Sequence, residues 1–185
     1  VYTPRDIVEY VVDQSLREYL CCAAWNPYLD EILEGNLPEN LGESTKQDII
    51  NRIKAVKILD PACGSGAFPM GCLNKIVDVV SLLSGDDSAQ SRYQTKLDII
   101  RNCIYGVDIQ PIAMMISKLR FFISLICDCP SVNVPTLPNL ETKFVAANTL
   151  IAADIRNADY QDTINLLGTD VDDTSIDGTL KDLKQ

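Results

Sequence analysis

The segment "ILDPACGSGAFPMG", residues 58–71, decides the fold class of this chain. Its first three residues complete the run "VKILD", residues 56–60, which is typical of a buried strand. Gly64 and Gly66 then break the strand. Apolar residues return at helical spacing from Phe68 onward. Ligands in open α/β sheets bind beyond the carboxyl ends of strands, where glycine lets the backbone approach them closely. The segment therefore predicts a strand, a ligand-binding turn and a helix.

The spacing of the glycines limits the kind of ligand. The turn lacks the G-x-G-x-x-G of dinucleotide-binding folds and the G-x-x-x-x-G-K-[ST] of phosphate-binding loops, and no lysine follows it. A neutral nucleoside-bearing ligand thus fits better than a pyrophosphate. The alternative is a tight strand–helix turn that binds nothing.

Two more strands are predicted after the glycine turn, at residues 103–108 and 143–148. Helices are expected at about 3–19, 44–55, 68–83, 89–101 and 110–126. This order predicts an α/β fold, a parallel sheet with helices on both faces. Asp108 ends the second strand, 42 residues after Gly66 (108 − 66), where a carboxylate can accept two hydrogen bonds from a ribose diol. The alternative is that Asp108 only caps the next helix.

Several local details follow from the same patterns. Thr3 is expected to cap the first helix, with Pro4 at its first position, and Ser44 to cap the second. Residues 26–43 are rich in turn-forming residues and are expected to be a loop. In the last helix one apolar face is expected, and Met114 and Met115 are expected in the core. The members of that face are Ile112, Met115, Ile116, Leu119, Phe122, Ile123 and Ile126.

Composition excludes several classes of function. The chain of 185 residues has no histidine, which excludes Ser-His-Asp and Cys-His catalysis and most zinc hydrolase sites. Its seven cysteines do not form two well-spaced pairs, so no metal site is expected and Cys63 is expected to be a small packing residue. An odd number of cysteines without a signal peptide indicates free thiols in a reducing cytoplasm. The longest strongly apolar stretch, residues 121–127, is too short for a membrane span.

The charge of the chain bears on its partners. Sixteen basic and 26 acidic residues give a net charge of −10, so the chain alone should repel a nucleic-acid backbone. Residues 154–185 contain eight aspartates and three basic residues, a charge of 3 − 8 = −5. We expect residues 152–185 to be an acidic linker or the start of an insertion.

Residues 60–68, "DPACGSGAF", resemble the S-adenosylmethionine-binding motif of amino-directed DNA methyltransferases. The similarity is greatest to the N6-adenine enzymes of bacterial restriction–modification systems, including chains that fuse modification with cleavage, and to related phage-defence methylases. Residues 1–12 are similar to the family's segment ahead of the sheet, 102–125 to its second-strand region and 137–151 to its third-strand region. The four segments occur in the family's order.

The resemblance implies a partial Rossmann-like methyltransferase fold with S-adenosylmethionine as cofactor. Asp60, Gly64 and Gly66 would hold the methionine half, and Thr3-Pro4 would lie near its carboxylate. Asp108 would bind the ribose, Ile109 would pack on the adenine, and Asn148 would contact the adenine edge, unless it is an ordinary turn residue. The implied cofactor-binding residues are Thr3, Pro4, Asp60, Pro61, Ala62, Cys63, Gly64, Ser65, Gly66, Phe68, Asp108, Ile109, Asn148, Thr149 and Leu150.

The family's catalytic Asn/Asp-Pro-Pro-Tyr/Phe motif is not found in this sequence. Asn26-Pro27-Tyr28 resembles it in part, but this segment has one proline and precedes the glycine turn, so it is not assigned as the motif. No catalytic residue is therefore assigned, and the fold is expected to be truncated before the catalytic strand. Residues 1–55 would be a helical segment contributing to the cofactor pocket, and 56–151 the cofactor-binding α/β core. Double-stranded DNA would bind a missing portion.

The leading hypothesis is the cofactor-binding portion of a cytoplasmic DNA adenine-N6 methyltransferase, inactive alone and in the intact protein optionally fused to a restriction endonuclease. Two alternatives stay open: a methyltransferase acting on RNA or protein, and a non-catalytic cofactor-sensing or interaction module.

Overall fold

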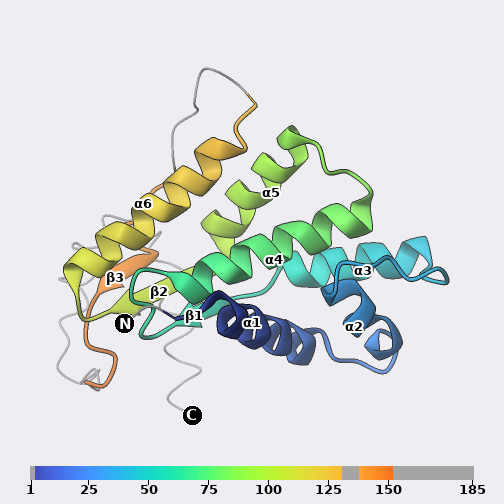
Figure 1. Cartoon of the computed structure of the whole chain (residues 1–185), viewed down its shortest axis with the longest axis horizontal. Helices are drawn as coiled ribbons and strands as arrows, with labels where there is room; N and C mark the ends of the chain where they lie inside the picture. Colours follow the sequence, from blue (N-terminus) through green and yellow to red (C-terminus); the bar gives the residue numbers. More distant parts are fainter. Residues whose placement is uncertain (1–2, 131–137, 152–185) are drawn as a thin grey trace, which may run out of the picture. The chain divides into compact units, whose positions relative to one another are not determined.

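A computed structural model describes residues 3–130 and 138–151 of the chain (Figure 1). The described residues up to Thr149 form one compact unit, and Leu150 begins a second. The prediction for residues 152–185 lies outside the described residues. The elements of the first unit are α1 (Arg5–Leu20), α2 (Asn26–Leu33), α3 (Glu43–Lys54), β1 (Ile58–Asp60), α4 (Ala67–Ser84), α5 (Ala89–Asn102), β2 (Ile104–Asp108), α6 (Pro111–Cys127) and β3 (Phe144–Ala146).

The strands form a parallel sheet in the order β1-β2-β3, which confirms the α/β class. Asp60 pairs with Gly106, and Gly106 pairs with Phe144, so the carboxyl ends of the strands lie at one edge. Both crossovers run in the same direction along the sheet, and right-handed crossovers then put α4 and α6 on the same face. The prediction of helices on both faces is wrong for the described residues. Leu59 and Val145 on the other face are 61% and 40% exposed.

Helix α4 is the centre of the core, between α1 and α5 in Figure 1. It is close to α1, because a Cβ at Gly71 would lie 2.6 Å from Cγ1 of Val8. By length and composition α4 is apolar enough to cross a membrane, but 56% of its residues are buried inside the fold, as expected for the core helix of a globular unit. Its buried apolar residues are Pro69, Cys72, Leu73, Ile76, Val77, Val79, Val80 and Leu83.

Three local predictions in the first 55 residues are wrong. Residues 26–33 form helix α2 instead of a loop, because Leu29, Ile32 and Leu33 occur at helical spacing and are buried against the core. Pro4, rather than Thr3, is the N-cap of α1. The N-cap of α3 is Gly42 rather than Ser44, with no side-chain hydrogen bond at the cap.

The buried side of α6 also differs from the prediction. Met114 is buried as predicted, but Met115 is 69% exposed, so its placement in the core is wrong. The helix is apolar around much of its circumference, and contact with the sheet decides which side is buried. The ring of Phe121 packs 4.8 Å from that of Phe144 on β3. The buried residues are Met114, Ser117, Phe121 and Leu125, and the exposed ones are Ile112, Met115, Ile116, Leu119, Ile123 and Ile126.

Candidate functional site

The glycine turn lies between β1 and α4, at the carboxyl edge of the sheet. Gly64 and Gly66 have φ angles of +54° and +82°, in the left-handed region that favours glycine. The N–H of Gly66 donates to the carbonyl of Cys63 at 2.8 Å, and the N–H of Ala62 donates to Oδ1 of Asp60 at 3.1 Å. The two glycines therefore allow a tight turn whose backbone is close to any ligand at this edge.

Asp60 leaves one carboxylate oxygen available at the base of this turn. Its Oδ2 atom is buried and accepts no hydrogen bond from the described residues. Burial, and secondly the charge of Asp108, raise the pKa of Asp60 above its ordinary value. A buried acceptor without a donor is costly in free energy, so a ligand that donates to Asp60 would relieve that cost.

Asp108 connects the turn to the end of β2. Its Oδ2 accepts from the N–H of Gly64 at 2.9 Å, and its Oδ1 accepts from the N–H of Gln110 at 2.8 Å. Gln110, not Asp108, is the N-cap of α6, so the helix-capping alternative is wrong. A carboxylate has about four acceptor positions. Two of them are therefore left for the hydroxyls of a diol.

The segment after β3 reaches the same edge of the sheet. The N–H of Ala147 donates to the carbonyl of Asp108 at 3.0 Å, and Oγ1 of Thr149 donates to the carbonyl of Pro61 at 3.0 Å. Asn148 is exposed, and Ile109 beside Asp108 is 66% exposed. The structure thus brings together the glycine turn, Asp108 and Thr149. Leu150 begins the second unit, so its predicted role stays a prediction.

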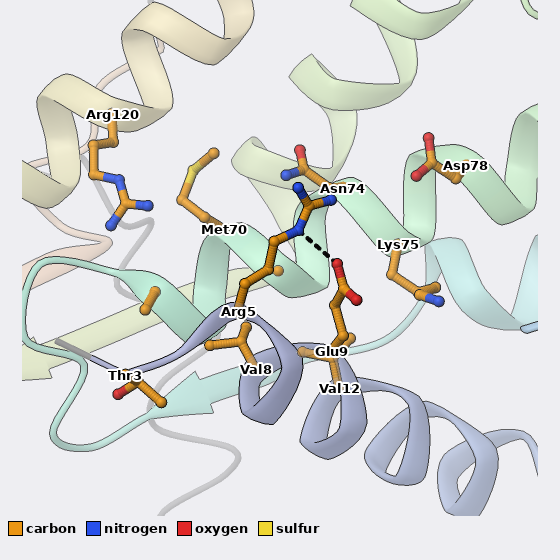
Figure 2. A pocket seen from close by; sticks show the side chains of 12 residues that line it. Thr3, Arg5, Val8, Glu9, Val12, Met70, Asn74, Lys75, Asp78 and Arg120 are labelled. Carbon is orange, nitrogen blue, oxygen red and sulfur yellow. Dashed lines mark hydrogen bonds and ion pairs between the residues drawn. The ribbon is translucent and has the colours of Figure 1, made fainter.

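Two cavities lie next to α1, and each is lined by residues that flank the turn. One of about 470 Å³ lies between α1 and α4, and Thr3, Ala67 and Arg120 line it (Figure 2). The other, of about 460 Å³, lies between α1 and β1, and Asp60, Pro61, Phe68 and side chains of α1 line it. The predicted residues are therefore divided: Thr3 belongs to the first cavity, and Asp60, Pro61 and Phe68 belong to the second.

Cys63 packs inside the turn, as a small residue would. Burial, with the charges of Asp60 and Asp108, raises the pKa of its thiol to about 12. Its Sγ atom is so close to β2 that a Cβ at Gly106 would lie 2.7 Å from it. A thiol in this environment is protonated at neutral pH and is not a nucleophile. Within the described residues, no group of three or more histidine, cysteine or acidic side chains could hold a metal ion.

Sequence reasoning missed two residues that hold the turn from α6. Oγ of Ser117 donates to the carbonyl of Gly64 at 3.0 Å, and Nη1 of Arg120 donates to the carbonyl of Ser65 at 2.9 Å. The signal in the sequence is a polar residue at each of two positions, one helical turn apart, in a mostly apolar helix that also carries Lys118 and Ser124. That signal gives no partner, because both contacts join positions more than 50 residues apart.

Comparison with known proteins gives two relatives, while no family model matches the chain. A type II restriction enzyme and methyltransferase of Methanocaldococcus jannaschii is 29% identical over 169 residues, which cover 81% of this chain and 14% of the relative. The adenine-specific methyltransferase PglX of Streptomyces coelicolor is 29% identical over 69 residues, 37% of this chain and 5% of the relative. The relatives support a methyltransferase family. S-adenosylmethionine is the usual methyl donor of such enzymes. The chain thus matches about one seventh of the length of the Methanocaldococcus jannaschii relative.

Proposed function

We propose that this chain is the S-adenosylmethionine-binding portion of a DNA adenine-N6 methyltransferase from a restriction–modification or related defence system. One observation carries the proposal: the glycine turn and Asp108 are joined through the Gly64 N–H, with Asp108 at the end of the neighbouring parallel strand. The names of the two relatives, one a restriction enzyme and methyltransferase and the other adenine-specific, support the choice of reaction and substrate.

The residues at the turn fit this cofactor in their chemistry. S-adenosylmethionine carries a ribose diol and an ammonium group, which donate hydrogen bonds, and its positively charged sulfonium supplies the methyl group. Two carboxylates, Asp60 and Asp108, lie at this edge, and Asp60 has a buried oxygen without a donor. A pyrophosphate would instead be repelled by this pair. A Rossmann-like methyltransferase fold agrees with the parallel sheet.

The proposed roles follow the position of each residue. Asp108 would accept from the ribose hydroxyls, Ile109 would pack on the adenine and Asn148 would contact its edge. Asp60 and the turn would hold the methionine half. The full set proposed to bind cofactor is Thr3, Pro4, Asp60, Pro61, Ala62, Cys63, Gly64, Ser65, Gly66, Phe68, Asp108, Ile109, Asn148, Thr149 and Leu150.

The rest of the predicted organisation is also a proposal. Residues 1–55 would contribute to the pocket, 56–151 would be the cofactor-binding core, and 152–185 would be an acidic linker. No residue of this chain is assigned to the methyl-transfer step. Double-stranded DNA would bind another portion of a longer protein, since this chain carries a charge of −10. Such a protein would work in the cytoplasm, with or without a fused endonuclease.

A second candidate is a cofactor-sensing or interaction module without catalysis. Its support is that the glycine turn and its contacts are formed within this chain. Such a module would bind the cofactor and transfer nothing.

The test is isothermal titration calorimetry of the chain with S-adenosylmethionine. We expect Asp108→Ala to weaken binding at least tenfold, because hydrogen bonds to a charged group contribute about 1.5–3 kcal/mol each. Asp48→Ala, an exposed aspartate on α3, is the matched control and should bind as the wild type does. Asp108→Asn keeps an acceptor for the Gly64 N–H, and it separates loss of ligand contact from collapse of the turn.

Either of two results would contradict the proposal. Equal affinity of wild type and Asp108→Ala would remove the ribose-binding role of Asp108. Absence of binding by the folded wild-type chain would contradict S-adenosylmethionine as the cofactor.

A further inference from the structure

Helix α6 holds the glycine turn through two side chains one helical turn apart. Ser117 is completely buried and donates from Oγ to the carbonyl of Gly64. The contact is close, since a Cβ at Gly66 would lie 2.8 Å from the same Oγ. Arg120 donates from Nη1 to the carbonyl of Ser65 at 2.9 Å. The turn is therefore fixed from α6 at two successive carbonyl groups.

Arg120 does more than hold the turn, because its side chain also lines the 470 Å³ cavity. Figure 2 shows it extending from α6 toward the side of α4 that carries Met70. Ala67, the first residue of α4 after the turn, and Thr3 line the same cavity. The guanidinium has five N–H donors, and the bond to Ser65 uses one of them. The others are available to a ligand in the cavity.

The charges around this cavity distinguish Arg120 from its neighbours. Among the described residues Arg120 takes part in no ion pair, although it is only partly exposed. Its positive charge is thus not neutralised by a carboxylate there. The other charged residues that line the cavity have partners of opposite charge: Arg5 with Glu9 at 2.7 Å, Lys75 with Asp13 at 2.7 Å and Asp78 with Arg92 at 2.9 Å.

We propose that Arg120 binds the carboxylate of the amino-acid portion of the cofactor. This inference rests on the proposed function. If the ribose of the cofactor is bound at Asp108, the amino-acid portion extends along the glycine turn. The cavity that Arg120 lines begins at Ala67, directly after the turn. The planar guanidinium matches a carboxylate in two parallel hydrogen bonds. Its bond to Ser65 fixes it beforehand, so less side-chain entropy is lost when the ligand binds.

The test compares two ligands that differ only in the carboxylate: S-adenosylmethionine and decarboxylated S-adenosylmethionine. Their affinities are measured by calorimetry for wild type and Arg120→Gln. We expect the wild type to bind S-adenosylmethionine at least about tenfold more tightly, since charge-assisted bonds are the strong class. Arg120→Gln should lose that preference and bind the decarboxylated ligand within about twofold of wild type. Arg120→Lys should keep part of the preference.

Arg5→Gln is the matched control, because Arg5 lines the same cavity but is paired with Glu9. It should leave the preference unchanged. Equal weakening of both ligands by Arg120→Gln would overturn the inference, since Arg120 would then act only by shaping the turn. The wild-type preference needs no variant, so it tests the inference even if Arg120→Gln does not fold. Equal wild-type binding of both ligands overturns the inference alone, whereas binding of neither overturns the proposed function as well.

Discussion

Replacing Gly66 with alanine should destabilise the fold more than the same replacement at Gly85. Both glycines have positive φ angles, +82° and +69°, and a left-handed conformation costs an alanine about 1–2 kcal/mol. The surroundings differ: a Cβ at Gly85 meets nothing within 4 Å, whereas a Cβ at Gly66 lies 2.8 Å from Oγ of Ser117. Gly85→Ala therefore measures the backbone cost alone.

The additional cost at Gly66 comes from Ser117. To relieve the contact, its Oγ must move away and lose its hydrogen bond to the carbonyl of Gly64, which contributes about 1 kcal/mol net. We therefore expect a loss of about 1–2 kcal/mol for Gly85→Ala and about 2–3 kcal/mol for Gly66→Ala. In a Ser117→Ala background the oxygen is absent and the nearest remaining atom is Cβ of residue 117, at 3.3 Å, so Gly66→Ala should cost only a little more than Gly85→Ala.

The assay is urea unfolding of the four members of this cycle and of Gly85→Ala, followed by circular dichroism. The expected coupling between Gly66→Ala and Ser117→Ala is about 1 kcal/mol, with similar m-values for all variants. Strictly additive losses, or a Gly66→Ala variant no less stable than Gly85→Ala, would refute the close packing of α6 on the turn.

Two further predictions concern the titratable groups of the turn. Burial and the charge of Asp108 raise the pKa of Asp60 above 3.8, so the folded state binds this proton more tightly than the unfolded state. Asp60→Asn should therefore be more stable than wild type at neutral pH. This difference in the free energy of unfolding should shrink as the pH falls through the raised pKa of Asp60 toward 3.8. Urea midpoints of the two proteins that differ by the same amount at every pH would contradict this prediction. The thiol of Cys63, with a pKa of about 12 and 5% exposure, should react with iodoacetamide at mildly alkaline pH much more slowly than exposed Cys21, as followed by peptide mass spectrometry.

The sequence is sufficient to predict those helices and strands that depend on local patterns of residues. β1 lies inside the predicted residues 56–60, β2 inside 103–108 and β3 inside 143–148. Each is a short apolar run that ends at a polar residue, Asp60, Asp108 or Asn148. α4 likewise begins at Ala67, one residue before Phe68, where helical spacing resumes. The parallel order places the ends of β1 and β2 together, and the bond from Gly64 to Asp108 is consistent with that expectation.

The buried side of α6 could not be predicted in the same way. Its apolar residues satisfy more than one helical face, so periodicity does not choose between Met114 and Met115. The choice depends on the sheet, where Phe144 packs on Phe121, a contact between residues that are distant in sequence. Helix α2 was missed because proline and asparagine at its start indicate a turn and a helix N-terminus equally well.

The conformation of the glycine turn is determined largely by residues far beyond it in sequence. Gly64 has its N–H held by Asp108, 44 residues later, and its carbonyl held by Ser117, 53 residues later. Arg120 holds the next carbonyl from 55 residues away. The glycines permit the turn, but the contacts from β2 and α6 determine its conformation. A ligand that binds this conformation of the turn therefore also stabilises the packing of β2 and α6 against it. For the same reason, a change in Ser117, which is completely buried and contacts the turn itself, should alter ligand affinity through the turn alone.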